Sequence, residues 1–150
     1  MMTMSRMKAA LRVAACAAAL CALPAFAQQP ADDSLYQALG AKPGLVKLMD
    51  DFMLRLLADA RMNPFFKDVN PSQLKSRLVE QFCQVAGGPC QYDGPNMKKA
   101  HEGVDIDRAA FNGLVEVLQQ SMDARGIAFG TQNRLLARLA PMHRDVINVE

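Results

Sequence analysis

Apolar residues recur every three or four positions along most of this chain, the spacing of one buried face of an α-helix. Strict alternation of apolar and polar residues, which is typical of strands, is missing. The pattern predicts an all-α protein with a short helical lead-in over Asp33–Leu39 that ends at Gly40. Four long helices follow: one carrying Leu45 to Leu56, one from Asn70 to Gly87, one from Asp107 to Gly126, and one from about Thr131 to Val146.

Residues that typically start or end a helix support these limits. Asn70 is a good N-cap, Pro71 suits the first helical position, and Gln73 stands where a capping-box partner belongs. The run Gly87-Gly88-Pro89 ends this helix. The sequence contains no internal repeat and no linker long enough to divide a domain, so we expect one domain.

The first 27 residues have a different pattern. Arg6, Lys8 and Arg12 give a positive start, Val13–Leu23 is apolar and uncharged, and Ala25-Phe26-Ala27 has the small-x-small form of a signal-peptidase site. We expect residues 1–27 to be a cleaved signal peptide and 28–150 to form the domain, in the periplasm or secreted. An uncleaved anchor is the alternative, although the apolar run is short for a span of about 20 residues. A lipoprotein cysteine at Cys16 or Cys21 fits less well, because no convincing recognition triplet precedes either.

Composition excludes several classes of protein. A length of 150 residues argues against a multidomain protein. A hydrophobic fraction of 51% argues against a disordered one. The net charge is +2, and loss of three cations with residues 1–27 leaves 14 Lys+Arg against 15 Asp+Glu. Nothing in this balance points to nucleic acid. After cleavage we expect no stable membrane insertion, and the sequence names no protein partner.

Between Gly87 and Asp107 the apolar periodicity lapses, and this stretch holds His101, one of two histidines in the chain. A segment of this length without periodicity is typically functional or disordered. Neutral imidazole is a good axial ligand for haem iron, and a single histidine suffices for that role. The sequence has no HExxH and no CxxC, which argues against zinc. His143, near the end of the last helix, fits a surface role.

Six segments in order resemble a group 1 truncated haemoglobin, a bacterial-like globin. The resemblance runs from about Ser34 to Ile147. The segments are Ser34–Gly40, Asp50–Asp59, Asn63-Pro64-Phe65-Phe66, Gly87-Gly88-Pro89 with Tyr92 and Gly94, Met97–Gly103, and Ala140-Pro141-Met142.

The resemblance implies a two-over-two helical sandwich around haem, with His101 as the proximal iron ligand. Because the sequence has no CxxCH, we expect haem b, held non-covalently. Phe66 would pack on the haem face, and Tyr92 would touch the haem edge or serve a structural role. Lys98 and Lys99 would either pair with propionates or face solvent. The remaining expected contacts are Leu74, Leu78, Met97, Ile106 and Phe111.

The chain departs from this family on the distal side. There the family has a tyrosine and a glutamine that donate hydrogen bonds to dioxygen, and the matching positions are Met53 and Leu78, with Leu74 adjacent. The resemblance therefore implies an apolar distal pocket. Met53 is most simply a packing residue. A second hypothesis makes its thioether a sixth iron ligand, as in His/Met haem proteins.

Cys83 and Cys90 are the cysteines that remain after cleavage. In one unbroken helix they would lie ~10 Å apart, too far to bond. Because Gly87-Gly88-Pro89 turns the chain back between them, we predict a disulfide that closes this corner in an oxidising compartment. Two buried free thiols are the alternative.

These features favour a haem protein that binds diatomic gases (O₂, CO, NO) over an enzyme. The alternatives are electron transfer through a His/Met haem, a nitric oxide dioxygenase or peroxidase, and a haem-free helical interaction protein. Peroxide cleavage needs a polar base near the iron, which the distal positions lack.

Overall fold

The computed structural model describes residues 32–150, and all regular secondary structure in this part of the chain is helical. The signal-peptide prediction for residues 1–27 lies outside the described residues. The elements are α1 (Ser34–Ala38), α2 (Ala41–Ala58), α3 (Asn63–Phe66), α4 (Pro71–Val85), α5 (Met97–Ala100), α6 (Arg108–Ala124), α7 (Phe129–Leu139), the 3₁₀ turn η1 (Ala140–Met142) and α8 (His143–Val146).

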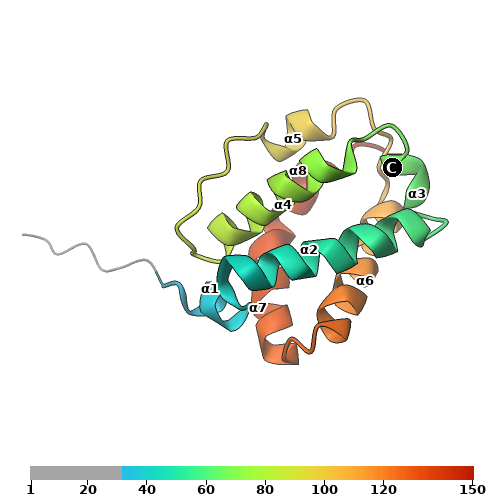
Figure 1. Ribbon diagram of the computed structural model, residues 1–150. Coiled ribbons are helices and arrows are strands. Elements are labelled where there is room, and N and C mark those ends of the chain that lie inside the picture. Colours follow the sequence, from blue (N-terminus) through green and yellow to red (C-terminus); the bar gives the residue numbers. More distant parts are fainter. Residues whose placement is uncertain (1–31) are drawn as a thin grey trace, which may run out of the picture.

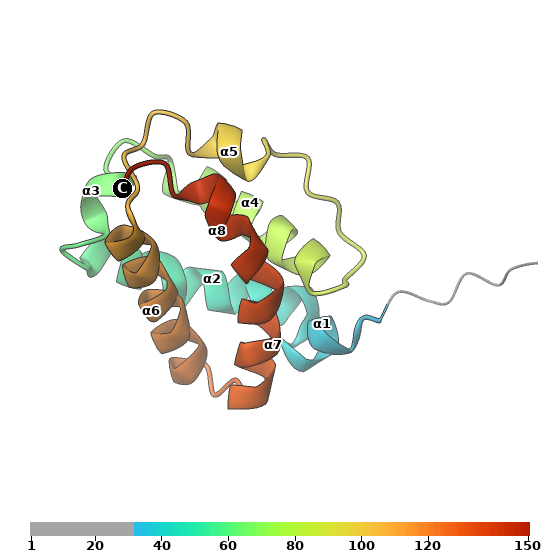
Figure 2. The same ribbon diagram turned by 180° about the vertical axis from the view of Figure 1, so that it is seen from behind.

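The helices form two layers, one of α2 and α4 and the other of α6 and the α7–η1–α8 segment. Helices α2 and α4 pack together and lie in front in Figure 1, whereas α6, α7 and α8 lie in front in the reverse view of Figure 2. Contacts of α2 with α6 and of α4 with α7 join the layers. The short α5 lies beside α4 and α8 in both views, and the C-terminus lies near α3. The all-α prediction is confirmed, in a two-over-two arrangement.

Side-chain caps fix where the helices begin. Asn70 accepts a hydrogen bond from the backbone N–H of Gln73 at 3.0 Å, and Asp107 accepts one from Ala110 at 2.7 Å. Each satisfies an N–H that the first turn leaves without an intrahelical partner. The predicted starts of α4 and α6 are thus confirmed with the residues that cause them.

The last predicted helix differs from the expectation. Instead of one helix from Thr131 to Val146, the chain forms α7 from Phe129, the turn η1 and then α8. Pro141 lies inside η1 and has no N–H to continue an α-helical ladder. The ladder therefore tightens at the proline and resumes at His143.

The core is aliphatic and rich in methionine. Helix α2 supplies its centre. None of the helices within residues 32–150 is long and apolar enough to cross a bilayer. The core side chains include Leu45, Leu48, Met49, Phe52, Met53 and Leu56 of α2, Val79, Phe82 and Cys83 of α4, Val117, Leu118 and Met122 of α6, and Leu135 of α7.

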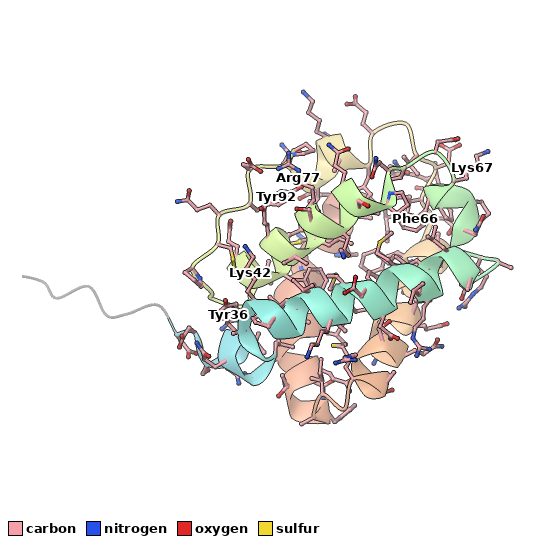
Figure 3. The ribbon with its side chains drawn as sticks, viewed as in Figure 1. Tyr36, Lys42, Phe66, Lys67, Arg77 and Tyr92 are labelled. Carbon is pink, nitrogen blue, oxygen red and sulfur yellow. A yellow bond between two sulfur atoms is a disulfide. The ribbon has the colours of Figure 1, made fainter. Side chains whose placement is uncertain are left out.

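A tight corner at the end of α4 starts the chain toward His101. Cys83 and Cys90 are joined by a disulfide across it, with Cα atoms 5.7 Å apart. Gly87 has φ +86°, and a side chain there would collide with the Asp32 carbonyl. The Tyr36 ring covers the corner, and its hydroxyl accepts a hydrogen bond from the N–H of Lys42 (Figure 3). Several independent contacts therefore hold the start of the aperiodic segment.

Candidate functional site

A cavity of about 450 Å³ lies among α4, α5, α6 and the α7–α8 segment. This volume falls in the range of small-molecule and cofactor sites. Its walls are mainly apolar, and they include Phe52, Leu74, Leu78, Phe82, Phe111, Leu114, Val115, Leu118, Leu136, Leu139, Met142 and Val146. Such walls suit a large apolar ligand.

His101 lies on this wall, at the C-cap of α5. Its Nδ1 lies 2.7 Å from the carbonyl oxygen of Met97, one turn earlier. Because a carbonyl only accepts hydrogen bonds, this contact places a proton on Nδ1, and in the neutral ring the lone pair is then on Nε2. A histidine that donates from one ring nitrogen to a carbonyl is oriented to bind metal through the other.

Five of the other expected pocket residues line the same cavity as His101. Leu74 and Leu78 lie one turn apart on α4. Tyr92, Met97 and Phe111 come from the loop before α5, from α5 itself and from α6. The structure thus brings together residues that are up to 37 positions apart in the chain, from Leu74 to Phe111.

Three expected pocket residues lie outside the cavity lining. Met53 is 6% exposed and packs in the core, while its neighbour Phe52 reaches the cavity. Phe66, at the end of α3, packs against the core cluster (Figure 3). Ile106 is buried beneath the last residues of the chain, and its backbone bonds to Asn148. The spacing of residues on a helix does not decide which of two adjacent residues faces the gap, because that depends on how the helix is rotated against its neighbours.

Polar groups gather at one side of the cavity. Arg77 on α4 forms an ion pair with Asp93, and the Tyr92 hydroxyl donates to the carbonyl of Pro95 at 2.9 Å. Figure 3 shows Arg77 and Tyr92 next to each other, where the loop passes α4. Partial burial raises the pKa of Tyr92 above its usual value. The phenol is therefore neutral at physiological pH and serves as a hydrogen-bond donor.

Gln81 is a cavity residue that the sequence analysis missed. It is 9% exposed, and its amide nitrogen lies 3.1 Å from the sulfur of Met97 and 3.9 Å from that of Met142. The signal was its position one turn after Leu78, on the same face of the helix. The α4 wall is therefore less uniformly apolar than Leu74 and Leu78 suggest.

The residues present fit a haem. The cavity offers one oriented imidazole on an apolar wall, and within residues 32–150 no cluster of three or more His, Cys, Asp or Glu side chains could hold a metal ion by itself. A metal bound to His101 therefore needs a ligand set of its own, such as a porphyrin. The lysines expected near the propionates, Lys98 and Lys99, are exposed on α5.

Comparisons with known proteins agree with this geometry. The model of the family described as bacterial-like globin matches residues 34–148. A group 1 truncated hemoglobin of Mycolicibacterium paratuberculosis is 31% identical over 117 residues, covering 78% of this chain and 86% of that protein. Another from a Nostoc species is 26% identical and covers 77% of this chain and 98% of that protein.

Solved structures show the same fold. The truncated hemoglobin of Tetrahymena pyriformis, in the Fe(III) form, superposes with a TM-score of 0.74 at 24% identity, covering 76% of this chain and 97% of that one. The 2/2 hemoglobin of a Synechococcus species gives 0.71 at 22% identity, covering 76% and 98%. The predicted two-over-two fold is confirmed, and since the family model spans most of the chain, this protein belongs to the bacterial-like globin family.

Proposed function

We propose that this protein is an exported haem protein that binds diatomic gases at an iron held by His101. The observation that carries the proposal is the Nδ1 contact of His101 with the Met97 carbonyl, which leaves Nε2 free on the wall of an apolar cavity. Haem-based gas binding is the activity that the family supports. The identity of the gas and the location of the protein are our extension of it.

The protein would hold haem b without a covalent bond, since the sequence lacks a CxxCH attachment motif. When bound, the haem supplies an iron with a coordination position for a gas. The chain supplies the axial imidazole of His101, and it excludes water with the apolar side chains of α4 and α6. Arg77 and the neutral Tyr92 phenol lie where polar groups of a ligand would meet the protein surface.

We infer that dioxygen is held less firmly here than in a pocket with polar distal residues. Leu74 and Leu78 on α4 cannot donate a hydrogen bond, and Met53 is buried in the core. Burying a polar diatomic ligand without a donor costs about 1–3 kcal/mol. That is roughly one to two decades in affinity. Carbon monoxide and nitric oxide depend less on such donors, so they bind with smaller losses.

Export is supported by the charged start, the apolar run Val13–Leu23 and Ala25-Phe26-Ala27. A disulfide between Cys83 and Cys90 is consistent with an oxidising compartment such as the periplasm. The location is tested by fractionating cells and by reading the N-terminus of the mature chain, which we expect at Gln28.

The electron-transfer alternative is supported less well, because its proposed iron ligand, Met53, is 6% exposed and packs among core side chains. The enzyme alternatives need a polar group that handles protons near the iron. Arg77 is paired with Asp93, and the amide of Gln81 contacts two thioethers. We therefore prefer a gas-binding role.

Optical spectroscopy of the ferric, ferrous and ferrous-CO forms tests the proposal, in the wild type and in His101→Ala. We expect a Soret band in the wild type, a high-spin ferrous form that takes up CO, and loss of the normal spectrum in His101→Ala. His143→Ala, the other histidine, is the matched control and should keep the wild-type spectrum. A colourless protein with haem supplied, or identical spectra for wild type and His101→Ala, would refute the proposal.

A further inference from the structure

We propose that Asn148 is a positioning residue for His101, through three hydrogen bonds that its side chain makes to the loop after the imidazole. This inference rests on the proposed function only in its haem readouts. It concerns a residue far from His101 in sequence, on the segment that follows α8.

Both the nitrogen and the oxygen of the Asn148 side-chain amide bond to the backbone of residues 101–106. Its nitrogen donates to the carbonyl of His101 at 2.9 Å and to that of Val104 at 2.5 Å. Its oxygen accepts from the N–H of Ile106 at 2.8 Å. The backbone adds a fourth bond, from the N–H of Asn148 to the carbonyl of Ile106 at 3.0 Å. One residue thus holds both ends of the loop that leads from His101 into α6.

This loop has few other restraints. Helix α5 has four residues, too short to be stable by itself, and Gly103 follows with φ +77°. Within the loop, the N–H of Val104 bonds to the carbonyl of His101 at 3.2 Å, which is a long contact. The bond from Nδ1 to the Met97 carbonyl sets the direction of the imidazole ring. The Asn148 hydrogen bonds fix the position of the backbone that carries this ring.

The same segment also reaches the cavity. Val146, two residues before Asn148, is 7% exposed and lines the cavity with His101. A shift of this segment would therefore move the wall beside the haem and release the loop together. This coupling is why we expect loss of the Asn148 amide to be felt at the iron and not only in overall stability.

The test compares Asn148→Ala and Asn148→Asp with the wild type and with Asn70→Ala. The Asp variant keeps the acceptor for Ile106 but loses both donors to the carbonyls of His101 and Val104. Asn70→Ala is the matched control, because it removes a cap from α4 and lowers stability without touching this loop. The readouts are the haem-release rate, the iron–histidine stretching band of the ferrous form, and amide exchange at Ile106.

We expect both Asn148 variants to release haem about tenfold faster, the scale of one lost hydrogen bond. Their iron–histidine band should shift or broaden, and Ile106 should exchange faster in Asn148→Ala. Asn70→Ala should leave the band unchanged. An unchanged band and release rate in a folded Asn148→Ala protein would overturn the proposal. If the wild type binds no haem, the proposed function fails instead. Amide exchange at Ile106 in the haem-free proteins then decides the inference. If Ile106 exchanges no faster in Asn148→Ala than in Asn70→Ala, the inference is overturned.

Discussion

The imidazole Nδ1 of His101 lies 2.7 Å from the carbonyl oxygen of Met97, one turn earlier on the same short helix. This contact fixes the tautomer of the ring, because the carbonyl can only accept. It also gives the Nδ1–H donor its hydrogen-bond partner, so Nε2 is the nitrogen left for a metal. Met97 therefore contributes twice to the site, with its carbonyl to His101 and with its side chain to the cavity wall.

The bond to Met97 predicts how small imidazoles rescue a His101→Gly variant. Imidazole should restore iron ligation, because it can bind through one nitrogen and donate to the carbonyl through the other. 1-Methylimidazole lacks that donor and should bind about three- to tenfold more weakly, the value of one hydrogen bond. Optical titration of the ferrous variant measures both affinities. Equal affinities would show that the carbonyl contact does not matter for ligation.

The disulfide at the corner of α4 predicts a loss of stability when it is removed. In Cys83→Ser/Cys90→Ser, the free energy of unfolding should fall by about 2 kcal/mol, because the bond closes a short loop. Urea denaturation of the haem-free protein measures the change. Wild type treated with reductant should match the double variant, and a wild type that is insensitive to reductant would argue for free thiols.

Gly88 stands where no side chain fits. A Cβ there would lie 2.6 Å from the Tyr36 ring and 2.8 Å from the sulfur of Cys83. We expect Gly88→Ala to cost about 1–3 kcal/mol of stability, since the buried corner has no room to relax. Gly130, at the start of α7, has open space around it, so Gly130→Ala should be neutral or stabilising by up to ~1 kcal/mol. Thermal denaturation of the two variants checks the contrast, and equal losses would contradict it.

Asp59 predicts a stability change in acid. Hydrogen bonds from the side chain and the backbone of Arg61 lower the pKa of Asp59 to about 2. Because an unfolded carboxyl titrates near pH 3.9, the stabilisation is complete above that pH and is lost as the pH falls toward 2. Asp59→Asn should therefore lower the urea midpoint at pH 7 and have little effect at pH 2. Arg61→Ala should reduce the same pH dependence, and a constant difference across this range would refute the assignment.

A substitution at Leu78 tests the effect of a hydrogen-bond donor on the cavity wall. Leu78→Gln adds an amide on the face of α4 that lines the cavity, so it should slow oxygen release about tenfold and change CO release much less. Stopped-flow and flash-photolysis kinetics measure both rates. Leu54→Gln is the matched control, since Leu54 is 71% exposed on α2, and it should leave both rates unchanged. Equal slowing of O₂ and CO release would point to a steric effect.

The sequence alone is enough to predict the helices, because their signals are local. Asn70, Pro71 and Asp107 act on backbone groups within one turn, and apolar spacing of three and four residues marks a buried face wherever the helix lies. It also singled out His101, since a lone histidine in an aperiodic segment is visible without coordinates. The break at Pro141 has a local cause too, but the apolar spacing continues through it and by itself predicts an unbroken helix.

Which side chains share the cavity follows from the packing of the whole fold and not from local sequence. Phe52 rather than Met53 lines the cavity. Gln81 lies against Met97 and Met142, and Asn148 bonds to the His101 loop. The physical reason is that these choices depend on how each helix is rotated and crossed against its neighbours. Packing of the whole core sets those angles, and residues far apart in sequence contribute to them.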